Sequence, residues 1–331
     1  MFELVHCATI SLVPDSSAAR LMLLDTASLY FRAYFGIPMT MQAPDGTPVN
    51  AVRGMLDFLG FLVNKHEPAR LVACLDADWR PAFRTDAVPS YKAHRVATGH
   101  EEEVPDELEV QVPIIVAALA ALGVTSLGVA GFEADDVIGT LATRDRDVDI
   151  VTGDRDLFQL VDDDRSVRVL YTARGVGNIQ IMDDSAIFEK YGVHGHEYAD
   201  FATLRGDPSD GLPGVPGVGD KTAASLIRAY GDLAGVRAAA LDSRTSLSKA
   251  QRRKITESAD YLDVAPAVVA VRADVPIPSA FADRTPTEPQ DRQALVDLDE
   301  RWDLGSSLRR AEAALFGEAV TPLRADPGDP A

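Results

Sequence analysis

Nine acidic residues stand out because they follow short apolar segments or lie in turns. They are Asp25, Asp76, Glu133, Asp135, Asp136, Asp154, Asp156, Asp207 and Asp210. Carboxylates are the hard oxygen ligands that Mg²⁺ and Mn²⁺ prefer. Hydrolysis of a phosphodiester by metal ions about 4 Å apart needs several such acids in one place. The sequence has no cluster of His or Cys residues, so zinc is disfavoured.

Each acid taken alone has a simpler explanation. Asp25 and Asp76 would serve equally well as helix N-caps, and Asp135 or Asp136 would complement a helix dipole. Asp207 and Asp210 are ordinary turn residues. Capping does not explain why acids recur at strand ends across the whole chain, so the set as a whole favours a metal site.

The elements that must position these acids alternate between strands and helices. Short apolar runs at 21–24, 70–75 and 148–152 predict buried strands, and helical patterns at 51–65, 108–122 and 135–144 lie between or beside them. This alternation predicts an α/β fold with a largely parallel central sheet flanked by helices. In such sheets the ligand site lies beyond the carboxyl ends of the strands, which is where the acids are.

The chain divides into four predicted regions. We expect an N-terminal extension at 1–20, an α/β domain at 21–195, a helical domain at 196–317 and a disordered tail at 318–331 that is rich in Pro, Asp and Gly. Strands at 167–171 and 178–182 read as a hairpin at the sheet edge, and 221–230 reads as a helix.

Basic and aromatic residues are interleaved at 79–84 and again at 91–95. Proteins that bind single strands combine cations that contact phosphates with rings on which bases stack. The simpler alternative places Trp79 and Phe83 in the core and the cations on a solvated face. The residues alone favour the simpler alternative.

A glycine-rich segment at 214–222 precedes the predicted helix at 221–230. Glycines let a backbone approach a phosphate closely, and a helix N-terminus offers free N–H groups to an anion. The spacing is not that of a Walker loop, and no strand leads into it as in a dinucleotide fingerprint.

The bulk properties describe an ordinary globular chain of 331 residues with a formal net charge of −19. That charge alone argues against nucleic acid, but metal ions would neutralise the crowded acids, and a local basic segment can still bind phosphate. The two cysteines, Cys7 and Cys74, make no disulfide framework, and a reducing cytoplasm fits. No signal peptide or membrane span is expected, and a cytoplasmic, nucleoid-associated location follows.

Several ordered motifs together resemble the 5′ nuclease domain of bacterial DNA polymerase I and the wider flap endonuclease family. The motifs lie at 25–32, 91–95, 132–136, 152–157 and 206–222, and the similarity extends over about 21–317. The resemblance implies a 5′-nuclease-like (PIN-type) α/β domain with a helical arch and a C-terminal helix–turn–helix hairpin that binds duplex DNA.

The resemblance also divides the nine acids into two clusters that hold two or three Mg²⁺ or Mn²⁺ ions. Asp25, Asp76, Glu133, Asp135 and Asp136 would form the first cluster, and Asp154, Asp156, Asp207 and Asp210 the second. All nine family acids are present, which indicates an active enzyme rather than a scaffold.

Further site residues follow from the same resemblance. Lys92 and Arg84 would approach the scissile phosphate, Arg95 and Arg32 would contact other phosphates, and Tyr91 would stack on a base. In the hairpin, the residues expected to contact DNA are Gly214, Gly217, Gly219, Lys221 and Thr222, with K⁺ bridging carbonyls and phosphate.

The predicted function is that of a monomeric, stand-alone 5′-3′ exonuclease and flap endonuclease acting in primer removal and repair. Its expected substrates are DNAs with 5′ flaps, nicks or junctions, and a DNA polymerase, a ligase or a sliding clamp are further candidate partners. Two alternatives are a smaller PIN-type ribonuclease, which the glycine-rich segment and second acid cluster disfavour, and a non-catalytic junction scaffold.

Overall fold

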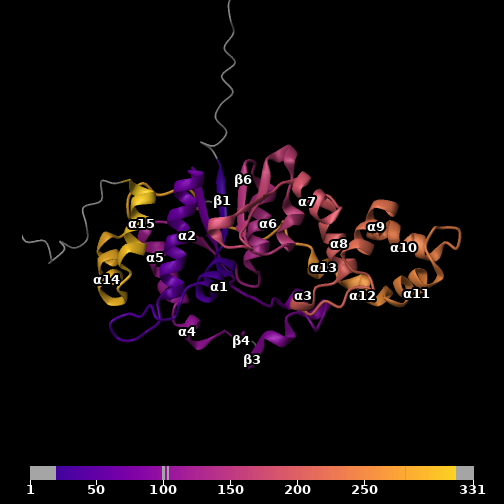
Figure 1. Cartoon of the computed structure of the whole chain (residues 1–331), viewed down its shortest axis with the longest axis horizontal. Coiled ribbons are helices and arrows are strands. Elements are labelled where there is room, and N and C mark those ends of the chain that lie inside the picture. The colour runs from indigo at the N-terminus through magenta and orange to yellow at the C-terminus, as the bar shows by residue number, and fades with distance from the viewer. Residues whose placement is uncertain (1–19, 99–100, 103, 280, 318–331) are drawn as a thin grey trace, which may run out of the picture.

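The computed structural model describes residues 20–98, 101–102, 104–279 and 281–317. The expected extension and tail therefore lie outside the described residues, apart from residue 20. A six-stranded sheet stands at the centre in the order β5-β2-β1-β6-β7-β8 (Figure 1). Its strands are β1 (Leu21–Asp25), β2 (Arg70–Cys74), β5 (Thr125–Leu127), β6 (Val148–Thr152), β7 (Val167–Tyr171) and β8 (Gln180–Met182). All neighbours pair in parallel except β7 and β8, so the predicted largely parallel α/β sheet with an edge hairpin is confirmed.

Fifteen α-helices occur in the described part of the chain. Those of the first half are α1 (Thr26–Gly36), α2 (Asn50–His66), α3 (Ala82–Ala87), α4 (Asp106–Glu109), α5 (Val112–Leu122) and α6 (Ala134–Arg144). Those of the second half are α7 (Asp184–Tyr191), α8 (Tyr198–Arg205), α9 (Asp220–Tyr230), α10 (Leu233–Leu241), α11 (Lys249–Glu257), α12 (Ala259–Val264), α13 (Pro266–Val269), α14 (Arg292–Trp302) and α15 (Gly305–Phe316). The single helix expected at 108–122 is split into α4 and α5, since Pro113 cannot donate a hydrogen bond back to α4.

The central strands are apolar because both of their faces are covered. Leu23 and Ile150 face one core cluster, whereas Leu24 and Val151 face the other. Cys74 is a buried free thiol in this core. Because β1, β2 and β6 are adjacent and parallel, the chain leaves all three at the same edge of the sheet.

The segment expected to form a helical arch is helical only in part. Besides α3 and α4 it contains a 3₁₀ turn at Ala93–Arg95 and a two-stranded ribbon of β3 (Val96–Thr98) and β4 (Glu101–Glu102). Proline residues at 81, 89 and 105 and the left-handed backbone of Lys92 (φ 47°) prevent one continuous helix.

Helices α8 to α13 extend from one end of the sheet, whereas α14 and α15 lie at the opposite end (Figure 1). The apolar faces of α14 and α15, with Leu295, Leu308 and Leu315, pack into the core cluster that also contains Met55 of α2. Ion pairs such as that of Arg310 with Asp57 reinforce the contact. The last two helices of the expected helical domain at 196–317 therefore pack on α2 and α5, which belong to the first half of the chain. No helix in the described residues is both long and apolar enough to cross a bilayer.

Candidate active site

Acidic side chains from five separate segments meet in one cavity of about 330 Å³ beyond the carboxyl ends of the central strands. The acids that line it are Asp25, Asp76, Glu133, Asp135, Asp154 and Asp207. Ser28, Phe31, Trp79, Lys92 and Arg95 complete much of the wall. Six of the nine predicted acids therefore share one cavity.

Asp25 shows that capping and site formation are compatible. It ends β1 and caps α1, accepting a hydrogen bond from the Ser28 amide at 3.1 Å through Oδ1. Its Oδ2 accepts a hydrogen bond from the Thr152 hydroxyl at 2.6 Å. Burial, opposed by the Thr152 hydrogen bond and assisted by the charge of Asp76, raises the pKa of Asp25 to about 7. These two hydrogen bonds fix the side chain in position, yet the protein compensates the negative charge of its carboxylate only poorly.

Two more acids of the cavity, Asp135 and Asp76, lie at the N-terminus of α6 or contact it, and the protein holds their carboxylates in different ways. Burial, then repulsion from Asp25 and Asp154, raises the pKa of Asp135 well above its usual range. Asp76 accepts a hydrogen bond from the Ala134 amide at 2.7 Å, which ties the loop after β2 to the start of α6. The cavity thus concentrates negative charge that only a cation can offset.

Glu133 is drawn toward the base of the expected arch. Its carboxylate is paired with the Lys92 amine and the Arg84 guanidinium and accepts a hydrogen bond from the Tyr91 hydroxyl at 2.9 Å. Burial raises the pKa of Glu133, although the charges of Lys92 and Arg84 oppose the shift. In the described part of the chain, no three acids converge closely enough to form a preassembled metal cage, because Glu133 and Asp207 are held by cations and hydroxyls of the protein.

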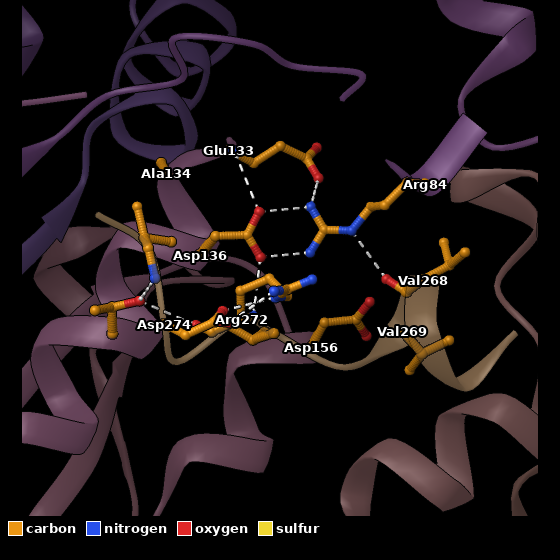
Figure 2. Close-up of polar contacts among 12 residues, drawn as sticks. Arg84, Glu133, Ala134, Asp136, Asp156, Val268, Val269, Arg272 and Asp274 are labelled. Atoms are coloured by element: carbon orange, nitrogen blue, oxygen red, sulfur yellow. Dashed lines mark hydrogen bonds and ion pairs between the residues drawn. The ribbon is translucent and has the colours of Figure 1, made fainter. Parts of the chain in front are cut away.

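Asp136, which the resemblance places among the metal ligands, does not line the cavity. The side chain is completely buried and forms a bidentate pair with Arg84, with Nη–Oδ distances of 2.6 and 2.9 Å. Figure 2 shows this pair, with Glu133 beside it and Arg272 below. Adjacent residues of a helix point about 100° apart, so Asp135 faces the cavity while Asp136 faces the interior.

Arg84 and Tyr91, which were expected to contact a phosphate and a base, are both buried. Arg84 is 3% exposed, and its Nε donates a hydrogen bond to the Val268 carbonyl at 3.0 Å, so its guanidinium is not free to contact a phosphate. Tyr91 is 4% exposed, and its hydroxyl is bonded to Glu133, so its ring is not available for stacking on a base. The basic and aromatic segment is thus partly core, but not in the way that the simpler alternative placed it, because Trp79 and Phe83 are only half-buried whereas the cation Arg84 is buried. Trp79, Lys92 and Arg95 remain in the cavity wall.

The second predicted cluster lies around the turns after β6 and α8. Asp154 accepts a hydrogen bond from the Asp156 amide at 2.8 Å, and burial followed by repulsion from Asp154 and Asp210 raises the pKa of Asp156. Asp210 forms an ion pair with Arg95 at 2.7 Å. Of these four acids, Asp154 and Asp207 line the cavity, whereas Asp156 and Asp210 do not, although Asp156 is close enough to both lining acids to feel their charge.

Two residues of the cavity wall, Ser28 and Phe31, and the buried Thr152 were not assigned to the site by the sequence interpretation. The Ser28 hydroxyl accepts a hydrogen bond from the Gly153 amide at 2.8 Å, and the Thr152 hydroxyl accepts one from the Asp154 amide at 2.8 Å. Phe31 lies one turn beyond Ser28 on the same face of α1. Ser28 and Phe31 lie three and six residues after Asp25, so the helical period could have placed both on the side of the helix that carries the site.

Arg32 lies in a neighbouring cavity of about 890 Å³, where its Nη1 donates a hydrogen bond to the Ala173 carbonyl at 3.1 Å. Phe31 and Gly153 line both cavities. Arg32 is therefore positioned at the margin of the acidic cavity rather than within it.

The glycine-rich hairpin contains two kinds of glycine. Gly214 (φ 64°) is buried, and a Cβ there would overlap the Arg205 backbone, so packing explains this glycine. Gly217 (φ 77°) is exposed and has only the Lys254 amine nearby. Gly219 is the N-cap of α9 and is open to solvent, with Lys221 exposed in the first turn and Thr222 half-buried.

The cavity and the hairpin are joined by direct contacts. The Lys92 amide donates a hydrogen bond to the Asp210 carbonyl at 2.9 Å, and Arg95 donates one to the Ser209 carbonyl at 2.7 Å. The turn at 207–211 leads within a few residues to Gly214. The base of the arch, the acidic cavity and the hairpin therefore occupy one connected region of the molecule.

Comparisons with known proteins agree with this geometry. Residues 20–192 match the family model of the 5′-3′ exonuclease N-terminal resolvase-like domain, and residues 193–293 match that of the 5′-3′ exonuclease C-terminal SAM fold. A 5′-3′ exonuclease of Streptomyces coelicolor is 60% identical over 87% of this chain and 98% of its own length. That of Mycobacterium tuberculosis is 48% identical over 89% of this chain and 97% of its own.

Solved structures share the fold at low sequence identity. The T5 D15 protein crystallised with metal ions is 16% identical, with a TM-score of 0.60 over 89% of this chain and 98% of its own. The catalytic core of Rad2 in complex with DNA substrate is 15% identical, with a TM-score of 0.57 over 91% and 93% of the two chains. The expected resemblance is confirmed, and the chain belongs to the 5′-3′ exonuclease family, enzymes that hydrolyse DNA from 5′ ends.

Proposed function

We propose that this 5′ nuclease cuts DNA where a 5′ single strand meets a duplex, using divalent ions held in the acidic cavity. The observation that carries the proposal is the meeting of six carboxylates from five segments in one cavity, with the Lys92 amine in its wall. Such an arrangement binds ions and a phosphate together, because the cations offset the carboxylates and the ammonium group faces the anion.

The donor set fits Mg²⁺ or Mn²⁺. Carboxylate oxygens line the cavity, and no His or Cys side chain is among them. Asp25, Asp76, Glu133 and Asp135 are suited to the first ion, and Asp154 and Asp207, supported by Asp156 and Asp210, to a second or third. Bound there, such ions supply an activated water and stabilise charge on the scissile phosphate.

The protein's own residues orient the strand. Burial acts to lower the pKa of Lys92, but Glu133, Tyr91 and Asp210 together raise it well above the usual range, so the side chain carries a positive charge. Lys92 and Arg95 are placed to contact phosphates, and the ring of Phe31 is placed at the edge of the cavity to pack against a base. This division assigns stacking to Phe31 instead of Tyr91.

The hairpin at 214–222 would hold the duplex part of the substrate. Gly217, Gly219 and Lys221 are exposed beside the N-terminus of α9, and K⁺ bridging carbonyls and phosphate remains the expected ion. Solved relatives include a T5 flap endonuclease complex with DNA and metal ions and Rad2 complexes with DNA substrate, which support this class of substrate. A polymerase, ligase or sliding clamp as partner, and a cytoplasmic location, are part of the same proposal.

A substrate panel tests the proposal. The protein is incubated with a 5′-flap DNA, an RNA strand of the same sequence and a plain duplex, each with Mg²⁺, Mn²⁺ or EDTA. We expect cutting at the flap junction with either ion and none with EDTA. Cutting of RNA alone would establish a PIN-type ribonuclease instead, and tight flap binding without cutting in any metal would establish a scaffold.

Binding should weaken steeply with salt, because phosphate contacts release counterions. We expect Lys221→Ala to weaken flap binding and to reduce the slope of log K against log [salt] by about 1, with turnover at saturating DNA unchanged. Fluorescence anisotropy between 50 and 200 mM salt measures this slope. Lys65→Ala on α2, a lysine that lies over the Phe61 ring, is the matched control and should leave the slope unaltered. A slope unchanged by Lys221→Ala would remove the hairpin from the DNA interface.

A further inference from the structure

Asp136 lies at the centre of a buried network that links three separate segments of the chain. Its two carboxylate oxygens receive the bidentate pair from Arg84, the Arg272 amide at 3.0 Å and the Glu133 amide at 3.3 Å. These donors come from α3, from the segment after α13 and from the start of α6 itself (Figure 2). With its hydrogen-bonding positions directed at protein donors and no exposed surface, this carboxylate has no access to the acidic cavity.

Arg84 is the counterpart of Asp136 and is equally committed to the network. Its Nη atoms pair with Asp136 and Glu133, and its Nε reaches the Val268 carbonyl of α13 at 3.0 Å. One guanidinium therefore joins the base of the arch, the start of α6 and α13, which is the last of the helices α8 to α13. A buried arginine with several carboxylate and carbonyl partners is rigid, because any rotation leaves charged groups unpaired.

The segment after α13 packs directly along α6. A side chain at Gly139 would overlap Val271 and the Arg272 carbonyl, so the absence of a Cβ permits this close approach. Thr140 reinforces it, accepting a hydrogen bond from the Val275 amide at 3.1 Å. The helix that carries Glu133 and Asp135 is thus clamped on one side by 271–275 and at its start by Arg84.

We propose that Asp136 and Arg84 are positioning residues rather than groups that contact ion or phosphate. Together they hold the N-terminus of α6 so that Glu133 and Asp135 face the cavity. They also connect that end of the helix to residues 271–275, which follow α13. The expected effect on metal binding and turnover rests on the proposed metal site, whereas the network itself is present in the protein without metal.

The same substitution at two adjacent positions separates positioning from ligation. In the full chain without metal, Asp136→Asn should lower Tm by roughly 6–15 °C, because it leaves the buried Arg84 incompletely paired. Asp135→Asn should leave Tm unchanged or raise it, since it removes repulsion from Asp25 and Asp154. Differential scanning fluorimetry measures both shifts. An Asp136→Asn variant as stable as the parent would overturn the proposal.

Titration with Mn²⁺ in the absence of DNA supplies the second readout. The Mn²⁺-induced rise in Tm should persist in Asp136→Asn, with the midpoint moved about 10- to 100-fold higher, and should be largely lost in Asp135→Asn. Complete loss in Asp136→Asn with an unchanged metal-free Tm would make it a ligand. Full retention in Asp135→Asn would instead contradict the proposed metal site, so the two failures are distinguishable.

A second variant, Arg84→Lys, tests the proposal even if Asp136→Asn fails to fold. Lysine keeps the charge but cannot reproduce the fork that binds Asp136 and Glu133 together. We expect a folded protein with the same KM for flap DNA, a kcat lowered about 10- to 100-fold and the same upward move of the Mn²⁺ midpoint. A raised KM with unchanged kcat would place Arg84 in the DNA interface and overturn its positioning role.

Discussion

Asp154→Asn is expected to abolish cutting, with kcat on a 5′-flap DNA at least about 1,000-fold lower, while flap binding persists. The carboxylate of Asp154 lies in the cavity wall beside Asp25 and Asp135, and the pKa values of both are raised in part by its charge. Removing one anionic ligand weakens the hold on an ion whose contribution to transition-state stabilisation is several kcal/mol, and about 4 kcal/mol corresponds to three orders of magnitude. Single-turnover cutting and anisotropy measure the two effects separately.

The amide of Asp154→Asn preserves the fold, since it keeps the size of the side chain and can still accept a hydrogen bond from the Asp156 amide. Glu288→Gln provides the control, because Glu288 is an exposed acid that does not line the cavity and should retain full activity. Full activity in Asp154→Asn would remove this residue from the metal site. A loss of DNA binding equal to the loss of turnover would mean that the carboxylate acts through folding.

Lys92→Ala is expected to lower kcat about 100- to 1,000-fold and to change Kd for flap DNA by no more than about threefold. The Lys92 amine lies in the cavity wall, paired with Glu133, where a phosphate held by the carboxylate-bound ions would meet it. A cation preorganised at the reacting phosphate stabilises charge that develops in the transition state, and losing one such donor costs this much in turnover. Rapid-quench kinetics at saturating DNA gives kcat, and anisotropy gives Kd.

Two features make Lys92→Ala informative. Glu133 keeps its contacts with Arg84 and Tyr91, so the cavity retains its shape. The left-handed backbone at position 92 imposes similar strain on alanine and lysine. Lys221→Ala is the complementary variant, since it should weaken binding and spare turnover. Equal falls in affinity and turnover for Lys92→Ala would reduce Lys92 to a docking residue.

Much of the nuclease was readable from the sequence because its signals are local. Apolar runs of about five residues with acids just past their ends indicated β1, β2 and β6, and parallel pairing then placed Asp25, Asp76 and Asp154 at one edge. The glycines before α9 indicated the hairpin. The strand β5 was not predicted, because it has only three residues, of which Leu127 alone is buried, and so short a segment leaves no periodic signal.

The packing of the last two helices was not readable. Their amphipathic pattern shows that α14 and α15 bury one face, but any apolar surface would satisfy that pattern. The distant side chains of α2 and α5 decide that the partner is the sheet domain rather than the neighbouring helices α8 to α13.

By itself the sequence determined which acids exist, which strands end beside them and which glycines open the hairpin, since these depend on residues close together in the chain. Only the tertiary structure decided between Asp135 and Asp136. The side chain of Asp136 is claimed by Arg84 and the Arg272 amide, 52 and 136 positions away, which no local pattern reveals. Arg84 and Tyr91 are buried for the same reason. The buried carboxylate of Glu133 needs hydrogen-bond donors, and the fold supplies them from residues that are distant in the sequence.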